Sequence, residues 1–160
     1  MDKSQLRIAI VKQLEADLAL LTEAALTSRD EATHEESRAE NQYDMHAQEA
    51  AYLAEGQAKM AAELRETLAH YQTLELSEAP TGAPIAVGAV VTVEPNGGEQ
   101  RTYFVGPRAG GLEVDWEKRT VMVVTPASPL GRQLMGRLPG DKIQLPSRTG
   151  TSDLRILSVD

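Results

Sequence analysis

Residues 77–84 read SEAPTGAP, and this short stretch separates two parts of the chain with different hydrophobic periods. Its two prolines and its glycine break helical continuity. The preceding residues are rich in alanine and contain no proline, whereas the following residues alternate between apolar and polar in short runs. The first pattern is typical of helices and the second of strands. We therefore predict a helical domain at residues 1–76, a linker at 77–85 and a compact sheet domain at 86–160.

The helical part carries two apolar stripes, each with spacings of three and four residues. The first consists of Val11, Leu14, Leu18, Leu21 and Ala25, and the second of Met60, Leu64, Leu68, Tyr71 and Leu74. A long helix with one narrow stripe cannot bury it alone, so we expect two antiparallel helices packed stripe to stripe. Residues 27–39 (TSRDEATHEESRA) contain few large apolar residues and several that favour helix caps. The pattern places the reversal of the hairpin there.

The second part contains six candidate strands, separated by residues that favour turns. They cover residues 89–93, 102–105, 112–114, 120–124, 142–145 and 154–159. One short helix is expected within residues 128–136, with Ser128 as its cap and Pro129 in its first turn. The predicted fold class is α+β, a helical hairpin followed by a small antiparallel sheet domain with one short helix.

Negative charge is concentrated in the first half of the chain. Residues 1–75 carry 15 Asp and Glu against 7 Lys and Arg, whereas residues 76–160 carry 9 of each. Seven of the acids lie between Asp30 and Glu49, in the middle of the helical pattern. An acidic surface disfavours nonspecific binding to a nucleic-acid backbone, which requires clustered Lys and Arg. A concentrated acidic tip can instead carry carboxylates into a confined site that holds a divalent cation.

Composition excludes several other classes of function. The chain has no cysteine, which excludes disulfides, iron–sulfur clusters and thiol catalysis. Only 4% of residues are aromatic, so a large aromatic-lined pocket is not expected. No apolar run approaches the roughly 20 residues that span a bilayer, and residues 1–13 do not resemble a secretory signal. We expect a soluble, cytoplasmic protein that makes no contact with a membrane.

Two segments resemble the bacterial Gre transcript-cleavage factors. Residues 124–145 (VTPASPLGRQLMGRLPGDKIQL) are similar to their C-terminal signature, in which Ser-Pro-Leu-Gly/Ala-Arg leads through a short helix to a Gly-Asp turn and a strand. Residues 40–56 (ENQYDMHAQEAAYLAEG) resemble the start of the second coiled-coil arm of these factors, with Glu40, Asn41 and Tyr43 as the most recognisable positions. The order of hairpin and sheet domain also matches, so the resemblance covers nearly the whole chain.

The resemblance implies an antiparallel coiled coil followed by a domain of FKBP-like fold. It implies that this second domain docks on the rim of the secondary channel of RNA polymerase, and that the coiled coil enters the channel. The docking segment then comprises Ser128, Pro129, Leu130, Gly131 and Arg132. Acidic residues at the tip help the polymerase hold its second Mg²⁺ and a water, so that backtracked RNA is cut near its 3′ end.

The same resemblance makes the chain an accessory factor and not itself an enzyme. Mg²⁺ usually takes only one or two carboxylates from a protein. We therefore expect the isolated chain to hold no cofactor, to bind Mg²⁺ weakly, and to share the ion with the polymerase. We also expect it to act as a monomer.

The tip departs from the family pattern at one decisive position. The family motif runs Gly-Asp-Leu-Lys-Glu-Asn, and residues 36–41 of this chain read Glu-Ser-Arg-Ala-Glu-Asn. Glu40 matches the acidic residue of the motif, but Ser37 occupies the position of its aspartate. A hydroxyl is a poor substitute for a carboxylate as a Mg²⁺ ligand, so Glu36 or Glu35 would have to supply the missing charge. Asn41 would cap the helix or orient Glu40. Tyr43 would pack between the arms near the tip, which is the preferred role, or contact nucleic acid.

Three functions are therefore weighed. The favoured one is an elongation factor that stimulates intrinsic RNA cleavage by the polymerase. The second is a secondary-channel regulator without cleavage activity, made so by Ser37. The third, suggested by the FKBP-like domain, is a peptidyl-prolyl isomerase, and it ranks far below the others because Tyr103, Phe104 and Trp116 are the only aromatic residues after the linker. Fold alone does not establish function.

Overall fold

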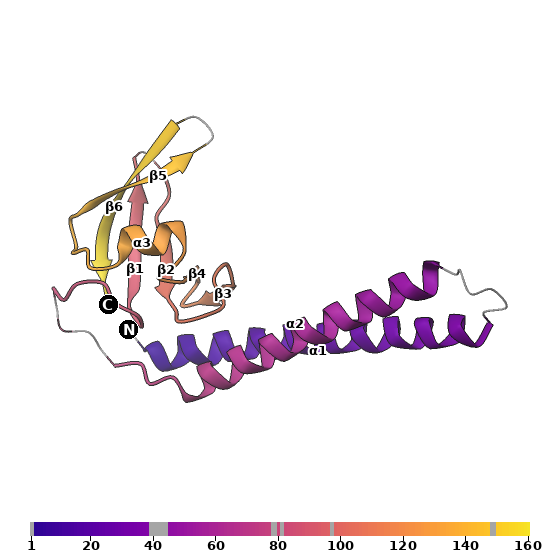
Figure 1. The fold of residues 1–160 in the computed structure, drawn as a ribbon. Helices are drawn as coiled ribbons and strands as arrows, with labels where there is room; N and C mark the ends of the chain where they lie inside the picture. Colours follow the sequence, from indigo (N-terminus) through magenta and orange to yellow (C-terminus); the bar gives the residue numbers. More distant parts are fainter. Residues whose placement is uncertain (1, 39–44, 78–79, 81, 97, 148–149) are drawn as a thin grey trace. The chain divides into compact units, whose positions relative to one another are not determined.

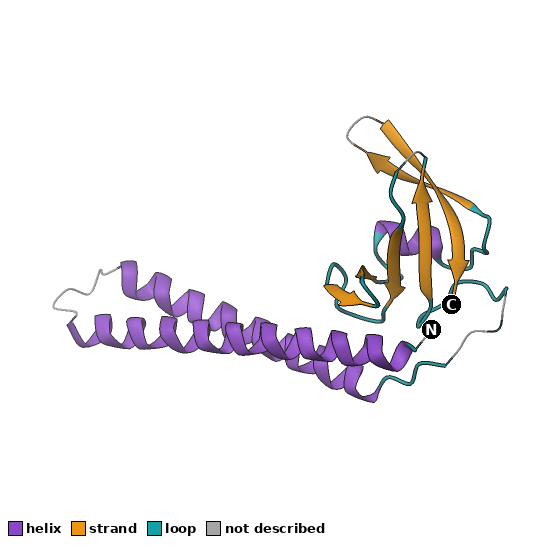
Figure 2. Cartoon of the chain, turned by 180° about the vertical axis from the view of Figure 1, so that it is seen from behind, coloured by secondary structure: helices purple, strands orange, loops and turns teal. Residues whose placement is uncertain are grey.

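A computed structural model describes residues 2–38, 45–77, 80, 82–96, 98–147 and 150–160. Two long helices, α1 (Lys3–Arg38) and α2 (Met45–Thr73), precede a six-stranded sheet with one short helix, α3 (Pro129–Leu134) (Figures 1 and 2). The α+β fold class is therefore confirmed. The chain divides into two compact units, one formed by residues 11–73 and the other by residues 1–10 and 74–160.

The position of the hairpin reversal differs from the prediction. Residues 27–38 continue α1, and the reversal lies between Arg38 and Met45. The cap-favouring residues are accommodated inside the helix because the hydroxyls of Thr27 and Thr33 donate to the carbonyls of Glu23 and Arg29, at 3.1 and 2.9 Å. Such bonds to the carbonyl four residues earlier allow threonine to remain within a helix.

A polar pair joins the two helices of the hairpin. The hydroxyl of Ser28 donates to the side-chain oxygen of Gln57 at 2.9 Å, and Ser28 is buried. Ser28 was expected to favour a helix end, but its partner lies on the opposite helix. A buried polar residue with one available partner favours a single register between packed helices.

The apolar interface of the hairpin is close to the predicted stripes, with one error. Leu14 and Tyr71 are fully buried, as expected. Met60 is 55% exposed, and its neighbour Ala61 occupies the buried position. Spacings of three and four residues connect Ala61 with Gln57 on one side and Leu64 on the other, so Met60 lies about 100° away from this line around the helix.

The six strands correspond to the six predicted ones with small changes in their ends. They are β1 (Val90–Pro95), β2 (Arg101–Val105), β3 (Glu113–Trp116), β4 (Arg119–Val124), β5 (Lys142–Ser147) and β6 (Gly150–Val159), in the order β3-β4-β2-β1-β6-β5. The prediction of a purely antiparallel sheet is wrong, because β2 and β4 pair in parallel. A parallel pair needs a connection of a dozen or more residues, and residues 106–118, which include the edge strand β3, provide it.

The core of the sheet unit lies between one face of the sheet and α3. Val91, Val93, Tyr103 and Val105 share this face with Ile156, and Leu134 of α3 packs against them. The alternating residues of the other face, including Val90, Phe104, Val121 and Val123, are also buried. Burial on both faces explains why β1 and β2 read as nearly continuous apolar runs.

The beginning of α1 is bonded to backbone within the same unit. The Lys3 ammonium donates to the carbonyls of Ser77 and Gly88, both at 3.1 Å, and Lys3 is only 5% exposed. The Arg7 guanidinium donates to the carbonyl of Leu74 at 2.9 Å. These bonds attach the backbone around the predicted linker, at Leu74 before it, at Ser77 where it starts and at Gly88 after it, to the first turns of α1. The domain boundaries at 76 and 86 stay a prediction.

Candidate functional site

The predicted docking segment forms α3 and the residue that caps it. Ser128 is the N-cap, and Pro129 occupies the first turn, as predicted. The Ser128 hydroxyl accepts from the amide of Gly131 at 3.0 Å and donates to the carbonyl of Thr125 at 2.8 Å. The cap therefore satisfies a helix amide that would otherwise lack a partner, and it also fixes the chain that leaves β4.

Gly131 has a packing role that its position in the motif did not reveal. It is buried, and a β-carbon built there would lie 1.9 Å from the carbonyl oxygen of Thr125. The helix backbone thus passes too close to the preceding turn for any side chain. Leu130 packs against the sheet core. Ser128, Leu130 and Gly131 are accordingly fixed by the fold.

The exposed residues of this segment are Pro129, Arg132 and Gln133. Pro129 and Arg132 are three residues apart and hence share one face of the short helix. Of the five residues predicted to bind a partner, these two present a free surface. Arg132 supplies a positive charge on the same exposed face as the apolar ring of Pro129, which suits a partner with an acidic and apolar surface.

The turn after α3 explains the remaining part of the motif. The side chain of Asp141 accepts from the amide of Leu138 at 2.9 Å, and the Asp141 amide donates to the Leu138 carbonyl. Gly140 has a φ of 94°, a left-handed conformation that favours glycine. Its amide donates to Ile156 of β6, so the Gly-Asp turn directs the chain into β5.

The sheet unit also contains a cavity of about 500 Å³ beside β2, β3 and β4. Arg101, Arg119, Glu99 and Glu113 are charged members of its wall, and Tyr103 is the aromatic residue among those that line it. Trp116 and Phe104 are buried elsewhere in the sheet. This charged cavity lacks the aromatic lining expected of a prolyl isomerase, and the geometry gives that function no support.

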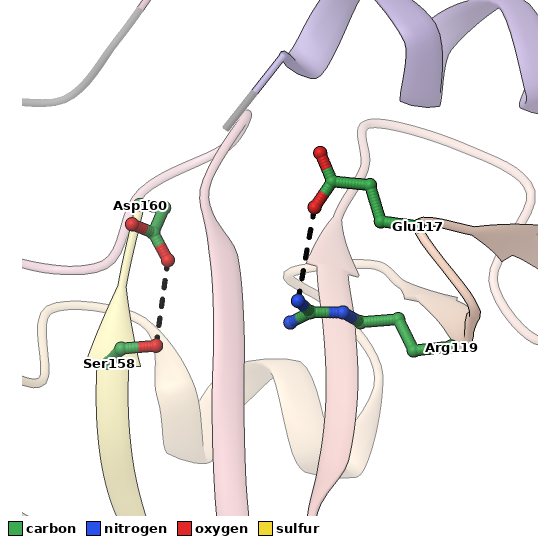
Figure 3. A network of polar contacts seen from close by, with 4 residues as sticks. All are labelled: Glu117, Arg119, Ser158 and Asp160. Atoms are coloured by element: carbon green, nitrogen blue, oxygen red, sulfur yellow. Dashed lines mark hydrogen bonds and ion pairs between the residues drawn. The ribbon is translucent and has the colours of Figure 1, made fainter.

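Trp116 of β3 is part of the buried core. It is 5% exposed, and its indole N–H has no hydrogen-bond partner in the described part of the chain. The Arg119 guanidinium lies 5.9 Å from the centre of its ring and also pairs with Glu117 at 3.8 Å. Figure 3 shows this pair, together with the 3.5 Å contact between Ser158 and Asp160. The Glu117 pair is exposed and so contributes little stability.

The predicted tip residues lie mostly outside the described part. Glu40, Asn41 and Tyr43 belong to residues 39–44, which the structure does not describe. The backbone of Glu35 and Glu36 forms the end of α1, whereas their side chains are also outside the described part. Asp30 and Glu31 are exposed on the same helix. Among the described residues, no group of three His, Asp or Glu side chains could hold a metal ion.

Comparison with known proteins identifies the family. The model described as "Transcription elongation factor, GreA/GreB, C-term" matches residues 80–160, which include the whole sheet, α3 and the Gly-Asp turn. The chain belongs to the GreA/GreB family. The family resemblance inferred from residues 124–145 is confirmed.

Individual relatives of this GreA/GreB-family chain are distant. It is 28% identical to the transcription elongation factor GreA of Xanthomonas campestris pv. campestris over 137 residues, which cover 85% of this chain and 81% of that protein. For GreA of Xanthomonas axonopodis pv. citri the identity is 28% over 114 residues, covering 71% and 66%. The crystal structure of the GreA factor homolog 1 (Gfh1) protein of Thermus thermophilus matches with a TM-score of 0.40 and 20% identity, covering 94% of each chain.

Neither long helix within the described ranges has the length and apolar character needed to cross a membrane.

Proposed function

We propose that this elongation factor binds RNA polymerase at the rim of its secondary channel and carries its acidic tip toward the polymerase active site. The observation that supports this most directly is the course of α1, which continues without a break to Arg38 before the chain reverses and α2 begins at Met45. The reversal therefore falls inside the acidic stretch from Asp30 to Glu49. A helix of 36 residues is about 54 Å long, which is sufficient to carry a tip deep into a channel.

The tip would contribute carboxylates to a metal site that the polymerase largely forms. Glu40 is the principal candidate because it matches the acidic position of the family motif, and Glu36 or Glu35 would add a second carboxylate in place of Ser37. Mg²⁺ retains several waters and takes few protein carboxylates. In a two-metal site the second ion stabilises the attacking and leaving oxygens. Cleavage chemistry would remain with the polymerase, and the tip carboxylates would orient the ion and a water.

Docking would use the exposed face of α3. Pro129 and Arg132 project from a helix that Ser128 and Gly131 hold against the sheet. Because Pro129 is exposed and aspartate is well tolerated in the first turn of a helix, Pro129→Asp should weaken polymerase binding without unfolding the domain. Retained affinity would remove this face from the interface.

A second candidate function rests on Ser37. With a hydroxyl at the position of the motif aspartate, the tip could occupy the channel and modulate the polymerase without stimulating cleavage. One experiment separates the two candidates: RNA cleavage is followed in a backtracked elongation complex with purified polymerase and Mg²⁺, with and without this chain. Faster shortening of the RNA supports the cleavage factor, whereas binding without faster shortening supports the regulator.

A further inference from the structure

A groove runs along one side of the helical hairpin, within the unit formed by residues 11–73. Its volume is about 380 Å³, and both helices contribute to its lining. Four alanines, Ala25, Ala54, Ala58 and Ala61, make its floor shallow and apolar. Leu26 stands at its side and is 56% exposed. Small side chains at such a position allow another backbone to approach closely.

The charges along this groove are opposite to those of the hairpin as a whole. Residues 11–73 contain 13 Asp and Glu but only 5 Lys and Arg. Two of these five, Arg29 and Arg65, line the groove. Both side chains are exposed, and neither forms an ion pair with another side chain in the described part of the chain. Glu55 is the one acid of the lining, so positive charge prevails.

The two arginines are separated along the groove. The groove alanines of α2 are Ala54, Ala58 and Ala61. The bond between Ser28 and Gln57 places Arg29 of α1 level with the first part of this run, and Arg65 lies one turn beyond Ala61 on α2. At about 1.5 Å per residue the two guanidinium groups bracket roughly 12 Å of apolar floor. On a helical ligand, acidic side chains seven or eleven residues apart share one face and are separated by about 10 to 16 Å.

We propose that this groove binds an acidic helical segment of a partner protein, which would lie along it as a third helix. Apolar contact with the alanine floor would provide buried area, and carboxylates at each end would pair with Arg29 and Arg65. Asp30 and Glu31, which begin the acidic stretch, directly follow Arg29 on α1 but do not line the groove. Acidic residues farther than about 8 Å from the groove are largely screened at physiological salt. This binding surface is distinct from the tip and from α3, and it does not depend on the cleavage role.

The test uses the full-length protein and a fluorescent alanine-based helical peptide of about 18 residues. Its glutamates are spaced seven and eleven residues apart on one face, and a control peptide of the same composition has them on different faces. Fluorescence anisotropy at physiological salt measures binding to the wild type, to Arg29→Glu/Arg65→Glu and to Lys59→Glu. Lys59 is exposed on the same hairpin but does not line the groove. Lys59→Glu therefore makes the hairpin more negative and leaves the lining of the groove unchanged. Circular dichroism checks that each variant retains its helix content.

The one-face peptide should bind, and the double reversal should weaken binding by about tenfold or more, whereas Lys59→Glu should change it less than about twofold. Ala58→Phe, which fills the groove without altering charge, should also abolish binding. Three results with the peptides would overturn the proposal: no binding of the one-face peptide, equal effects of Lys59→Glu and the double reversal, or equal binding of the two peptides. A single-stranded RNA oligonucleotide that binds more tightly and requires both arginines would assign the groove to nucleic acid and likewise overturn it.

Discussion

Gly131 lies so close to Thr125 that a β-carbon at residue 131 would stand 1.9 Å from the Thr125 carbonyl oxygen. The same carbonyl accepts the hydroxyl of Ser128, which in turn accepts the Gly131 amide. The Ser-Pro-Leu-Gly motif is therefore a structural device that brings a short helix against the end of β4. Its partner-binding role, as proposed, depends on this close approach.

Gly131→Ala should destabilise the sheet unit by about 2 kcal/mol or more, because the added methyl group meets backbone that cannot move aside easily. Unfolding in urea, followed by the fluorescence of the single tryptophan, Trp116, measures this change. Gly56→Ala is the matched control: it makes the same substitution in α2, where nothing lies within 4 Å of the added carbon. It should stabilise the hairpin by about 0.5–1 kcal/mol. Equal effects of the two substitutions would contradict the packing argument.

Ser28 and Gln57 should be energetically coupled. Their hydrogen bond joins the two helices, and its loss in Ser28→Ala should reduce the free energy of unfolding by about 1 kcal/mol. A double-mutant cycle with Gln57→Ala, followed by circular dichroism in urea, should give a coupling energy of about 0.5–1.5 kcal/mol. Thr27→Ala, which removes a neighbouring hydroxyl bonded within its own helix, should change stability little. Additive effects of Ser28→Ala and Gln57→Ala would show that the pair does not set the register.

The turn between β3 and β4 should be open to stabilisation. Glu117 and Lys118 both have positive φ, 49° and 63°, and connect the paired residues Trp116 and Arg119. Two-residue hairpin loops of this kind favour glycine at the second position. Lys118→Gly should therefore raise stability by about 0.5–1 kcal/mol, measured by thermal unfolding. Lys118→Val should lower it, since a β-branched residue fits this conformation poorly. The reverse order would exclude backbone strain as the cause.

Lys3 should stabilise the sheet unit through its backbone bonds and not through its charge alone. Lys3→Met retains an apolar side chain of similar length but leaves the carbonyls of Ser77 and Gly88 without their donor. We expect a loss of about 2 kcal/mol in urea unfolding, within the range for hydrogen bonds to a charged group. Lys12→Met, at an exposed position of the same helix, should have an effect below about 0.5 kcal/mol. Similar losses in both variants would point to net charge as the cause.

Local signals in the sequence predicted the elements of this fold well. Ser128 and Pro129, two adjacent residues, are sufficient to predict where α3 begins. Short runs with a period of two residues predict the strands. Features that depend on distant residues were missed. The parallel pairing of β2 with β4 depends on where the β3–β4 hairpin inserts into the sheet, and the helical role of Ser28 depends on Gln57, which is 29 positions away. Met60 was assigned to the interface because it lies four residues before Leu64. Ala61 lies three residues before Leu64, and only the structure shows that Ala61 is the buried residue.

The candidate sites show the same division. The motif of residues 128–132 located the docking segment, but only the structure separates exposed Pro129 and Arg132 from residues that the fold requires. The groove left a weak signal in the sequence, since Arg29 and Arg65 are two of the five basic residues of the hairpin. Sequence spacing within one helix cannot reveal a surface that two helices share. The tip assignment rests on alignment to the family motif and stays a prediction.

The most direct test of the account measures RNA cleavage in a backtracked elongation complex with purified polymerase and Mg²⁺. The wild-type chain, Glu40→Ala and Glu49→Ala are compared, since Glu49 is an exposed acid on α2 outside the tip motif. The account predicts faster cleavage with the wild type and with Glu49→Ala, and a steep loss with Glu40→Ala at unchanged polymerase affinity. Wild-type protein that binds the polymerase and leaves the cleavage rate unchanged would contradict it.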